Sequence, residues 1–164
     1  MSVSTMKTII FQLIDLHNRL NQMAGEKTEA IKKGDIQSVD RLAHQELPLI
    51  ENIQKLERAR AEEVRQTTAG FASPESSWTF RSWIQKIVPE QEQREWQLLY
   101  ERLSGAVNAL KNANQLNQAM LMQSLQWVKL SINLLQPQPM QPVGYGSKRD
   151  RRFSAGSSRI DSRA

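Results

Sequence analysis

Apolar residues recur in steps of three and four along most of the chain, which is the spacing of one face of an α-helix. Within residues 3–33, Lys27 alone interrupts this repeat. Its members are Met6, Ile9, Leu13, Leu16, Leu20, Met23 and Ala30. The spacing is the a/d pattern of a coiled coil, held over about four heptads. It predicts a first helix over residues 3–33 with one apolar seam.

The first helix is expected to turn back into a second one over residues 36–69. Lys33 and Gly34 are typical of a helix end, and Asp35 is a suitable N-cap for the next helix. So short a connection predicts an antiparallel hairpin. Pro48 predicts a kink or a new helix start, because proline removes a backbone donor and clashes with the preceding turn. The predicted inner face comprises Ile36, Val39, Leu42, Leu49, Ile53, Leu56 and Val64.

Two further helices are predicted over residues 74–88 and 90–136. Pro74 begins the short one, which carries Trp78, Phe80, Trp83, Ile84 and Ile87. Pro89 separates it from the last helix, whose first turn holds acidic residues that the helix dipole favours. At ~1.5 Å per residue the last helix would be about 70 Å long and the first about 46 Å. The hairpin therefore cannot cover the whole of the last helix.

The number of apolar stripes on the last helix differs between its two halves. Its N-terminal half has one seam, which consists of Trp96, Leu99, Leu103, Ala106, Leu110 and Ala113. Its C-terminal half has two apolar stripes. The inner stripe consists of Leu121, Leu125, Val128, Ile132 and Leu135, and the outer stripe of Leu116, Met120, Trp127, Leu130 and Leu134. One stripe suffices to pack on the hairpin, so two stripes imply a partner surface. The pattern leaves open which stripe is core, and our hypothesis takes the outer stripe as the partner surface. Cover by the short helix, by the C-terminal tail or by a homodimer is the alternative.

The last 28 residues, 137–164, predict a disordered basic tail after a single helical domain over residues 1–136. They hold three of the six prolines and three of the seven glycines. Six Lys or Arg against two Asp leave +4 of the net charge of +5 in this segment. A basic tail can bind nucleic acid or an anionic membrane, but no aromatic platform or basic amphipathic helix accompanies it. Solvation of the tail is the simpler interpretation.

Catalytic chemistry is not indicated. The chain has no cysteine, and no apolar run approaches the ~20 residues of a transmembrane helix. We expect a cytoplasmic protein without membrane insertion, and neither an enzyme nor one that uses a cofactor or metal. His17 and His44 are expected on solvated helix faces, away from clustered carboxylates.

Several segments resemble FlgN-type flagellar export chaperones. Residues 13–60 are similar in their leucine ladder, their Gly-Asp turn and the Leu-Glu-Arg-Ala-Arg run at 56–60. Residues 110–135 are similar in two asparagines, Asn114 and Asn117, ahead of a leucine run. The tail is similar in Tyr145-Gly146 and in the closing Ile-Asp-Ser-Arg-Ala at 160–164.

The resemblance implies a non-catalytic, cytoplasmic chaperone of flagellar type III export. Such a protein would bind the C-terminal helices of the two hook-filament junction proteins, prevent their premature assembly and deliver them to the export gate at the membrane. Our hypothesis places the client groove on the outer stripe, with Tyr145, Phe153 and Ile160 of the tail as further anchors. Tyr145 would also dock on the export gate. A self-associating helical adaptor and a nucleic-acid-binding helical protein are the alternatives.

Overall fold

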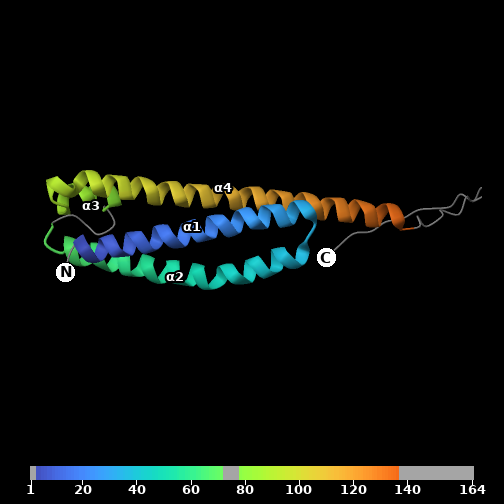
Figure 1. The fold of residues 1–164 in the computed structure, drawn as a ribbon, viewed down its shortest axis with the longest axis horizontal. Coiled ribbons are helices and arrows are strands. Elements are labelled where there is room, and N and C mark those ends of the chain that lie inside the picture. The colour runs from blue at the N-terminus through green and yellow to red at the C-terminus, as the bar shows by residue number, and fades with distance from the viewer. Residues whose placement is uncertain (1–2, 72–77, 137–164) are drawn as a thin grey trace, which may run out of the picture.

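The computed structural model describes residues 3–71 and 78–136, and these ranges contain four helices and no strand (Figure 1). The helices are α1 (Val3–Lys33), α2 (Ile36–Thr68), α3 (Phe80–Ile87) and α4 (Glu90–Leu135). α1 lies between α2 and α4, and α3 lies at the end of the molecule where α4 begins (Figure 1). The predicted all-α class, an elongated hairpin with one long last helix, is confirmed. The predicted disordered tail lies outside the described residues.

The turn between α1 and α2 has the predicted chemistry. Gly34 adopts a φ of 70°, the left-handed conformation that glycine accepts most readily. The Asp35 side chain caps α2 by accepting a hydrogen bond of 3.0 Å from the backbone N–H of Ser38. The Ser38 hydroxyl also donates to this carboxylate, and the two bonds hold the pKa of Asp35 below its usual range. The hairpin is therefore fixed by local sequence.

Pro48 does not divide α2. The helix runs as one element from Ile36 to Thr68, so a new helix start at Pro48, one of the two predicted outcomes, is wrong. In Figure 1 the ribbon of α2 is unbroken and gently bowed. Pro48 is exposed, and on that side of a helix the carbonyl that loses its donor can accept a hydrogen bond from water.

The short helix begins later than predicted. Trp78 and Thr79 are not helical, and α3 starts at Phe80, so the predicted start at residue 74 is wrong. A capping box sets the start, because Thr79 and Ser82 each accept a hydrogen bond from the other's backbone N–H. Val88 ends α3 in an extended conformation, as expected for a residue that precedes proline.

An aromatic core joins α1, α3 and α4 at one end of the molecule. Trp83 and Trp96 are completely buried, and their ring centroids lie 5.3 Å apart. Phe80 stacks on Trp83 at 5.8 Å, and the indole N–H of Trp83 donates to Thr67 Oγ1 of α2 at 2.8 Å. The α1 side of this core is formed by Met6, Ile9, Ile10, Leu13 and Ile14. This end therefore carries most of the large buried side chains.

Burial differs from the prediction at His17 of α1 and at Ile36 of α2, and for His17 the reason is that α1 is buried on two sides. His17 is 8% exposed, not solvated, and its Nδ1 lies 2.7 Å from the carbonyl oxygen of Leu13. Helices flank α1 on both sides, so a polar residue beside the predicted seam is covered by the second neighbour. Ile36, predicted on the inner face of α2, is 68% exposed, because it is the first residue after the turn.

An ion pair joins the distal halves of α1 and α2. Lys27 Nζ lies 2.6 Å from Glu46 Oε2, and each side chain is only 13% exposed. This pairing explains why Lys27 stands in an otherwise apolar seam. A charge at this depth is tolerated because a partner and a hydrogen bond offset its desolvation.

Candidate functional site

The site that the fold exposes is the free end of α4. α1 and α4 run parallel, since Lys7 pairs with Glu95 near their starts and Asn21 donates to the Ala106 carbonyl farther along. α1 has 31 residues and α4 has 46, so α4 continues past the end of α1 (Figure 1). We call residues 122–135 of α4 the overhang.

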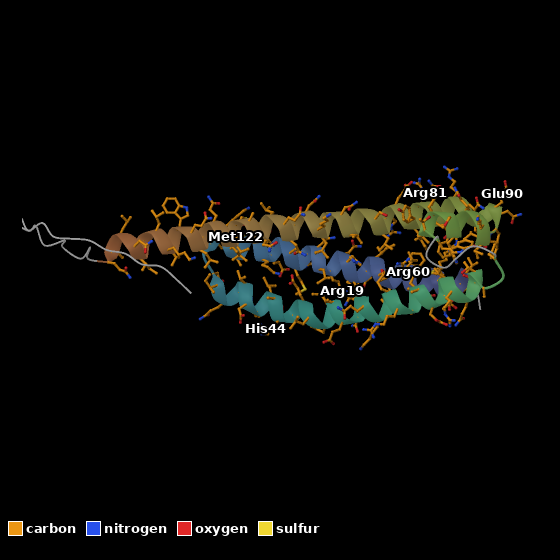
Figure 2. All side chains as sticks on the ribbon, turned by 180° about the vertical axis from the view of Figure 1, so that it is seen from behind. Arg19, His44, Arg60, Arg81, Glu90 and Met122 are labelled. Atoms are coloured by element: carbon orange, nitrogen blue, oxygen red, sulfur yellow. The ribbon has the colours of Figure 1, made fainter. Side chains whose placement is uncertain are left out.

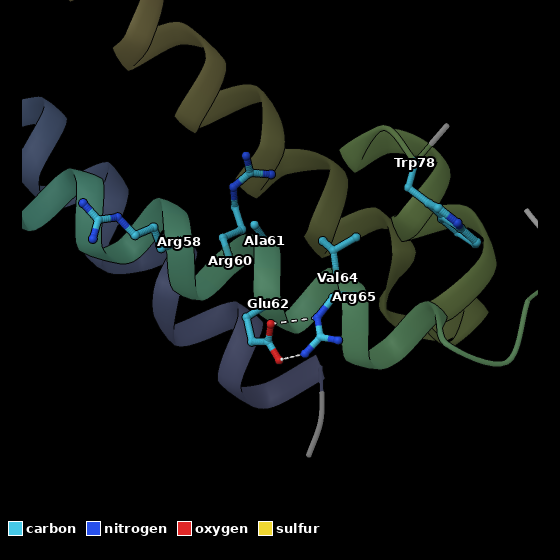
Figure 3. A pocket seen from close by; sticks show the side chains of 7 residues that line it. All are labelled: Arg58, Arg60, Ala61, Glu62, Val64, Arg65 and Trp78. Carbon is cyan, nitrogen blue, oxygen red and sulfur yellow. Dashed lines mark hydrogen bonds and ion pairs between the residues drawn. The ribbon is translucent and has the colours of Figure 1, made fainter. Parts of the chain in front are cut away.

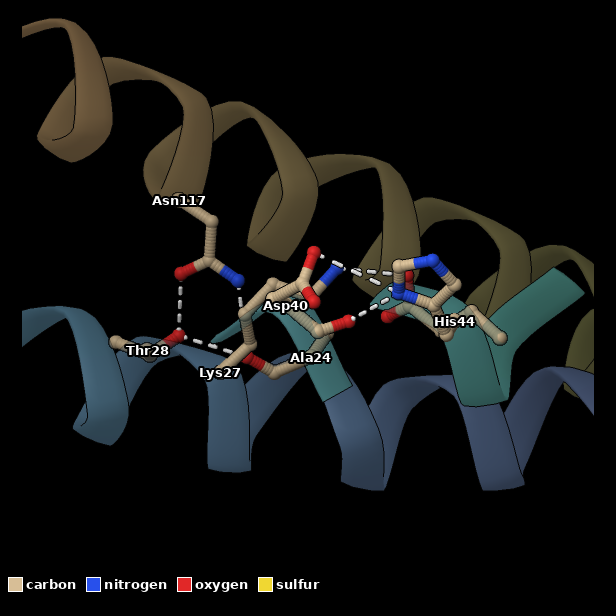
Figure 4. A network of polar contacts seen from close by, with 7 residues as sticks. Ala24, Lys27, Thr28, Asp40, His44 and Asn117 are labelled. Atoms are coloured by element: carbon tan, nitrogen blue, oxygen red, sulfur yellow. Dashed lines mark hydrogen bonds and ion pairs between the residues drawn. The ribbon is translucent and has the colours of Figure 1, made fainter. Parts of the chain in front are cut away.

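A polar clasp joins α4 to α1 shortly before the overhang begins (Figure 4). Asn117 is 3% exposed and donates from Nδ2 to the Ala24 carbonyl at 2.9 Å. Its Oδ1 accepts a hydrogen bond of 2.6 Å from the Thr28 hydroxyl. Both ends of the amide are therefore satisfied, and the bonds fix the register of α4 on α1.

The overhang is apolar and uncovered. Each of its residues is exposed, whereas Leu121 just before it is half-buried. The large apolar side chains on it are exposed by 50–82%, and they are Met122, Leu125, Trp127, Val128, Leu130, Ile132, Leu134 and Leu135. Lys129 is the one charged residue between positions 112 and 136. In Figure 2, Met122 lies where α1 ends. A contiguous apolar surface of this kind on a small protein marks an interaction site.

The sequence-predicted site residues divide into three groups. Leu116, Trp127, Leu130 and Leu134 of the outer stripe are exposed, and Met120 is half-buried. The inner stripe is exposed as well from Leu125 onward, because α1 ends before it can reach these side chains. Cover of the outer stripe by the short helix, one of the predicted alternatives, is wrong, because α3 packs at the opposite end of α4 (Figure 1). Tyr145, Phe153 and Ile160 lie outside the described residues.

A second surface feature lies on the C-terminal half of α2 (Figure 3). A cavity of about 560 Å³ is lined by Arg58, Arg60, Ala61, Glu62, Val64, Arg65 and Trp78. Two of its arginines are neutralised within α2, since Arg60 pairs with Glu57 and Arg65 with Glu62. These pairs leave little net charge to attract a charged ligand.

The pKa of the Glu62 carboxylate is lowered in the fold, so the stability of the protein is expected to depend on pH. Hydrogen bonds from Arg65 and then Gln66 lower its pKa from 4.5 to about 2. A lowered folded-state pKa stabilises the fold above the unfolded value, so this contribution is present above pH 4.5 and is lost as pH falls toward 2. We expect a Glu62→Gln variant to lose less stability than the wild type across that window. Urea unfolding at several pH values tests this, and equal acid slopes for the two proteins would contradict it.

Neither a metal site nor a membrane span appears in the described part of the chain. Across residues 3–71 and 78–136, no three His, Cys, Asp or Glu side chains are grouped so as to hold a metal ion. Among the helices in the same ranges, none is both long and apolar enough to cross a membrane.

Comparisons with known proteins agree with a helical flagellar protein. The family model described as FlgN protein matches residues 1–152. An uncharacterised protein of Bacillus subtilis, YvyG, is 31% identical over 134 residues, which cover 80% of this chain and 81% of YvyG. A crystal structure titled as a flagella synthesis protein FlgN of Pseudomonas aeruginosa superposes with a TM-score of 0.59. That match has 20% identity and covers 80% of this chain and 98% of the other, so it shows the fold alone.

The class of protein is thus an all-α bundle that presents an unpaired helix end. The chain belongs to the FlgN family, whose model spans most of its length. This family is of the chaperone type and non-enzymatic, and membership gives the chain a role connected with the flagellum and with flagellar protein partners.

Proposed function

We propose that this protein is a cytoplasmic export chaperone for the hook-filament junction proteins. It binds their C-terminal helices on the overhang, prevents their premature assembly and delivers them to the flagellar type III export gate. The observation that carries this proposal is the uncovered apolar surface at residues 122–135, together with membership of the FlgN family. The action consists of binding and release, without catalysis or a cofactor.

The physical chemistry of the overhang suits a helical client. A segment that forms an amphipathic helix needs an apolar partner for its buried face, and a rigid helix with exposed ridges supplies one. Lys129 is the one charge in this part of α4, so binding depends on apolar contact more than on ion pairs. The association should therefore change little with salt, unlike the binding of a basic tail to nucleic acid.

Two groups of residues contribute to the proposed site. The outer stripe supplies the anchors: Trp127, Leu130 and Leu134 lie on the overhang, and Leu116 and Met120 lie just before it. Tyr145, Phe153 and Ile160 of the tail close over the bound helix. A segment that orders on binding can wrap a large surface and still release its partner, which an export chaperone requires. Tyr145 has a further role in docking on the export gate.

Calorimetric titration with C-terminal peptides of the two junction proteins tests the proposal. We expect saturable binding with a negative heat-capacity change, weaker when the chain is truncated at Pro137. A variant with both Trp127→Ala and Leu130→Ala should lose roughly 10- to 100-fold in affinity, as expected for buried interface anchors. Leu98→Ala is a matched control, because Leu98 is 55% exposed and Leu130 57%, but Leu98 lies at the other end of α4.

Several results would contradict parts of the proposal. Absence of binding to either peptide would exclude these clients. An equal loss of affinity for Leu98→Ala and for the Trp127→Ala, Leu130→Ala double variant would place the site away from the overhang. Light scattering that shows a concentration-dependent dimer unaffected by client would favour self-association. For Tyr145→Ala we expect reduced export, and a variant that binds client normally and also exports normally would remove the docking role of Tyr145.

A further inference from the structure

The interface between α1 and α4 alternates large and small residues on the α4 side. Large and small side chains follow one another in steps of three and four at Leu103, Ala106, Leu110 and Ala113. The small residues permit close approach, since the Asn21 side chain of α1 reaches the Ala106 carbonyl at 2.9 Å. Such a ridge of alternating size accepts the side chains of a facing helix between its large members.

The same alternation continues through the overhang. From Asn117, steps of four and three lead to Leu121, Ser124, Val128, Ser131 and Leu135. Serine here takes the place that alanine has beneath α1. Each serine hydroxyl donates to its own helix at 3.0 Å, Ser124 to the Met120 carbonyl and Ser131 to that of Trp127. The serines are thus satisfied internally and can be covered by an apolar partner without loss of a hydrogen bond.

Large apolar residues flank this row on both sides. At 3.6 residues per turn, Trp127 and Leu134 lie roughly 90° to one side of the row, and Leu125 and Ile132 roughly 70° to the other. The serine row is therefore a strip with small side chains at every second position, between large apolar side chains of the outer stripe on one side and Leu125 and Ile132 on the other. We call this strip the channel. The channel starts where α1 ends, and it continues the α1–α4 interface without a break.

We infer that one client helix lies in this channel in line with α1, with its centre over Ser124 and Ser131. This inference rests on the proposed function and specifies where and how the client binds. The occupant is an amphipathic helix with apolar residues in steps of three and four over about four turns, matching the length of the overhang. Its contact face lacks charge, since the channel offers no carboxylate and only Lys129 as a cation. The client then extends the bundle where α1 stops.

A larger side chain in the serine row tests the inference. We expect Ser131→Trp to weaken binding of a junction-protein C-terminal peptide by about tenfold or more, because overpacking prevents close approach. Ser131→Ala should bind as tightly as wild type. Gln126→Trp adds the same side chain roughly 180° away from the row, and should leave affinity unchanged. Circular dichroism of each variant establishes that helix content is preserved.

Whether Ser131→Trp weakens or strengthens client binding distinguishes a helix seated in the channel from unspecific apolar adhesion. An added tryptophan on a merely adhesive surface would strengthen binding, so unchanged or tighter binding by Ser131→Trp overturns the inference while the proposed function stands. If wild-type protein binds neither peptide, the proposed function itself fails. Light scattering without client measures the oligomeric state and is the third test. If wild type is dimeric, Ser131→Trp is monomeric and client affinity is equal, a second copy of the chain occupies the channel and the inference is overturned.

Discussion

A Trp83→Ala variant is expected to unfold at a much lower denaturant concentration than the wild type. Trp83 is fully buried, stacks on Phe80 and donates its indole N–H to Thr67. Removal of such a side chain typically lowers the free energy of unfolding by about 3–5 kcal/mol. Because small domains have about 5–15 kcal/mol in total, this loss would take a large share of the stability. Urea unfolding monitored by circular dichroism measures it.

Trp127→Ala is the matched control for that experiment. Trp127 is 66% exposed on the overhang, so its removal deletes no core contact. We expect a change within about 0.5 kcal/mol, the usual range for surface substitutions. Comparable losses for the two tryptophans would mean that the overhang is covered in the free protein, contrary to its described exposure.

The second large effect is expected at the Lys27–Glu46 pair. Lys27→Met removes the partner of a carboxylate that is only 13% exposed. The other oxygen of this carboxylate, Glu46 Oε1, already has no hydrogen-bond partner among the described residues. Leaving a largely buried acceptor unsatisfied costs about 1–3 kcal/mol. We expect a loss of this size in the free energy of unfolding, measured by denaturant titration at neutral pH.

A double variant and a surface pair provide the controls. Lys27→Met combined with Glu46→Leu should recover most of the loss, because an apolar pair replaces a desolvated ion pair. Arg19→Met removes the partner of Asp15 in a pair whose side chains are 63% and 61% exposed, and should change stability little. If the double variant is less stable than Lys27→Met, the pair itself contributes net stability and the argument from desolvation is wrong.

Local signals predicted most of the fold. Gly34 and Asp35 defined the hairpin turn, and the step pattern placed α1 and α4 to within a residue. Those signals act between neighbours in the chain and need no tertiary context. The Thr79–Ser82 capping box is an equally local signal, but the prediction rested on Pro74 and therefore placed the start of α3 too early.

The errors arose where the number of neighbouring helices decides burial. One seam was assigned to α1, but α2 and α4 cover it from two sides, so His17 is buried. For the candidate site, the difference in length between α1 and α4 predicted an uncovered segment. Periodicity alone did not reveal that the inner stripe past Leu121 would be free, because this depends on the parallel register set near Asn117.

The clasp at Asn117 also divides α4 into two parts with different resistance to local opening. Amides before it are protected by helix hydrogen bonds and by the packing of α1, whereas amides of the overhang are protected by helix hydrogen bonds alone. The last turn of α4 carries no basic residue to stabilise the helix dipole. Hydrogen exchange should therefore quicken from Leu121 toward Leu135. A bound client would slow exchange along this same gradient. The exchange rates of the overhang amides would therefore show, residue by residue, where a client is bound.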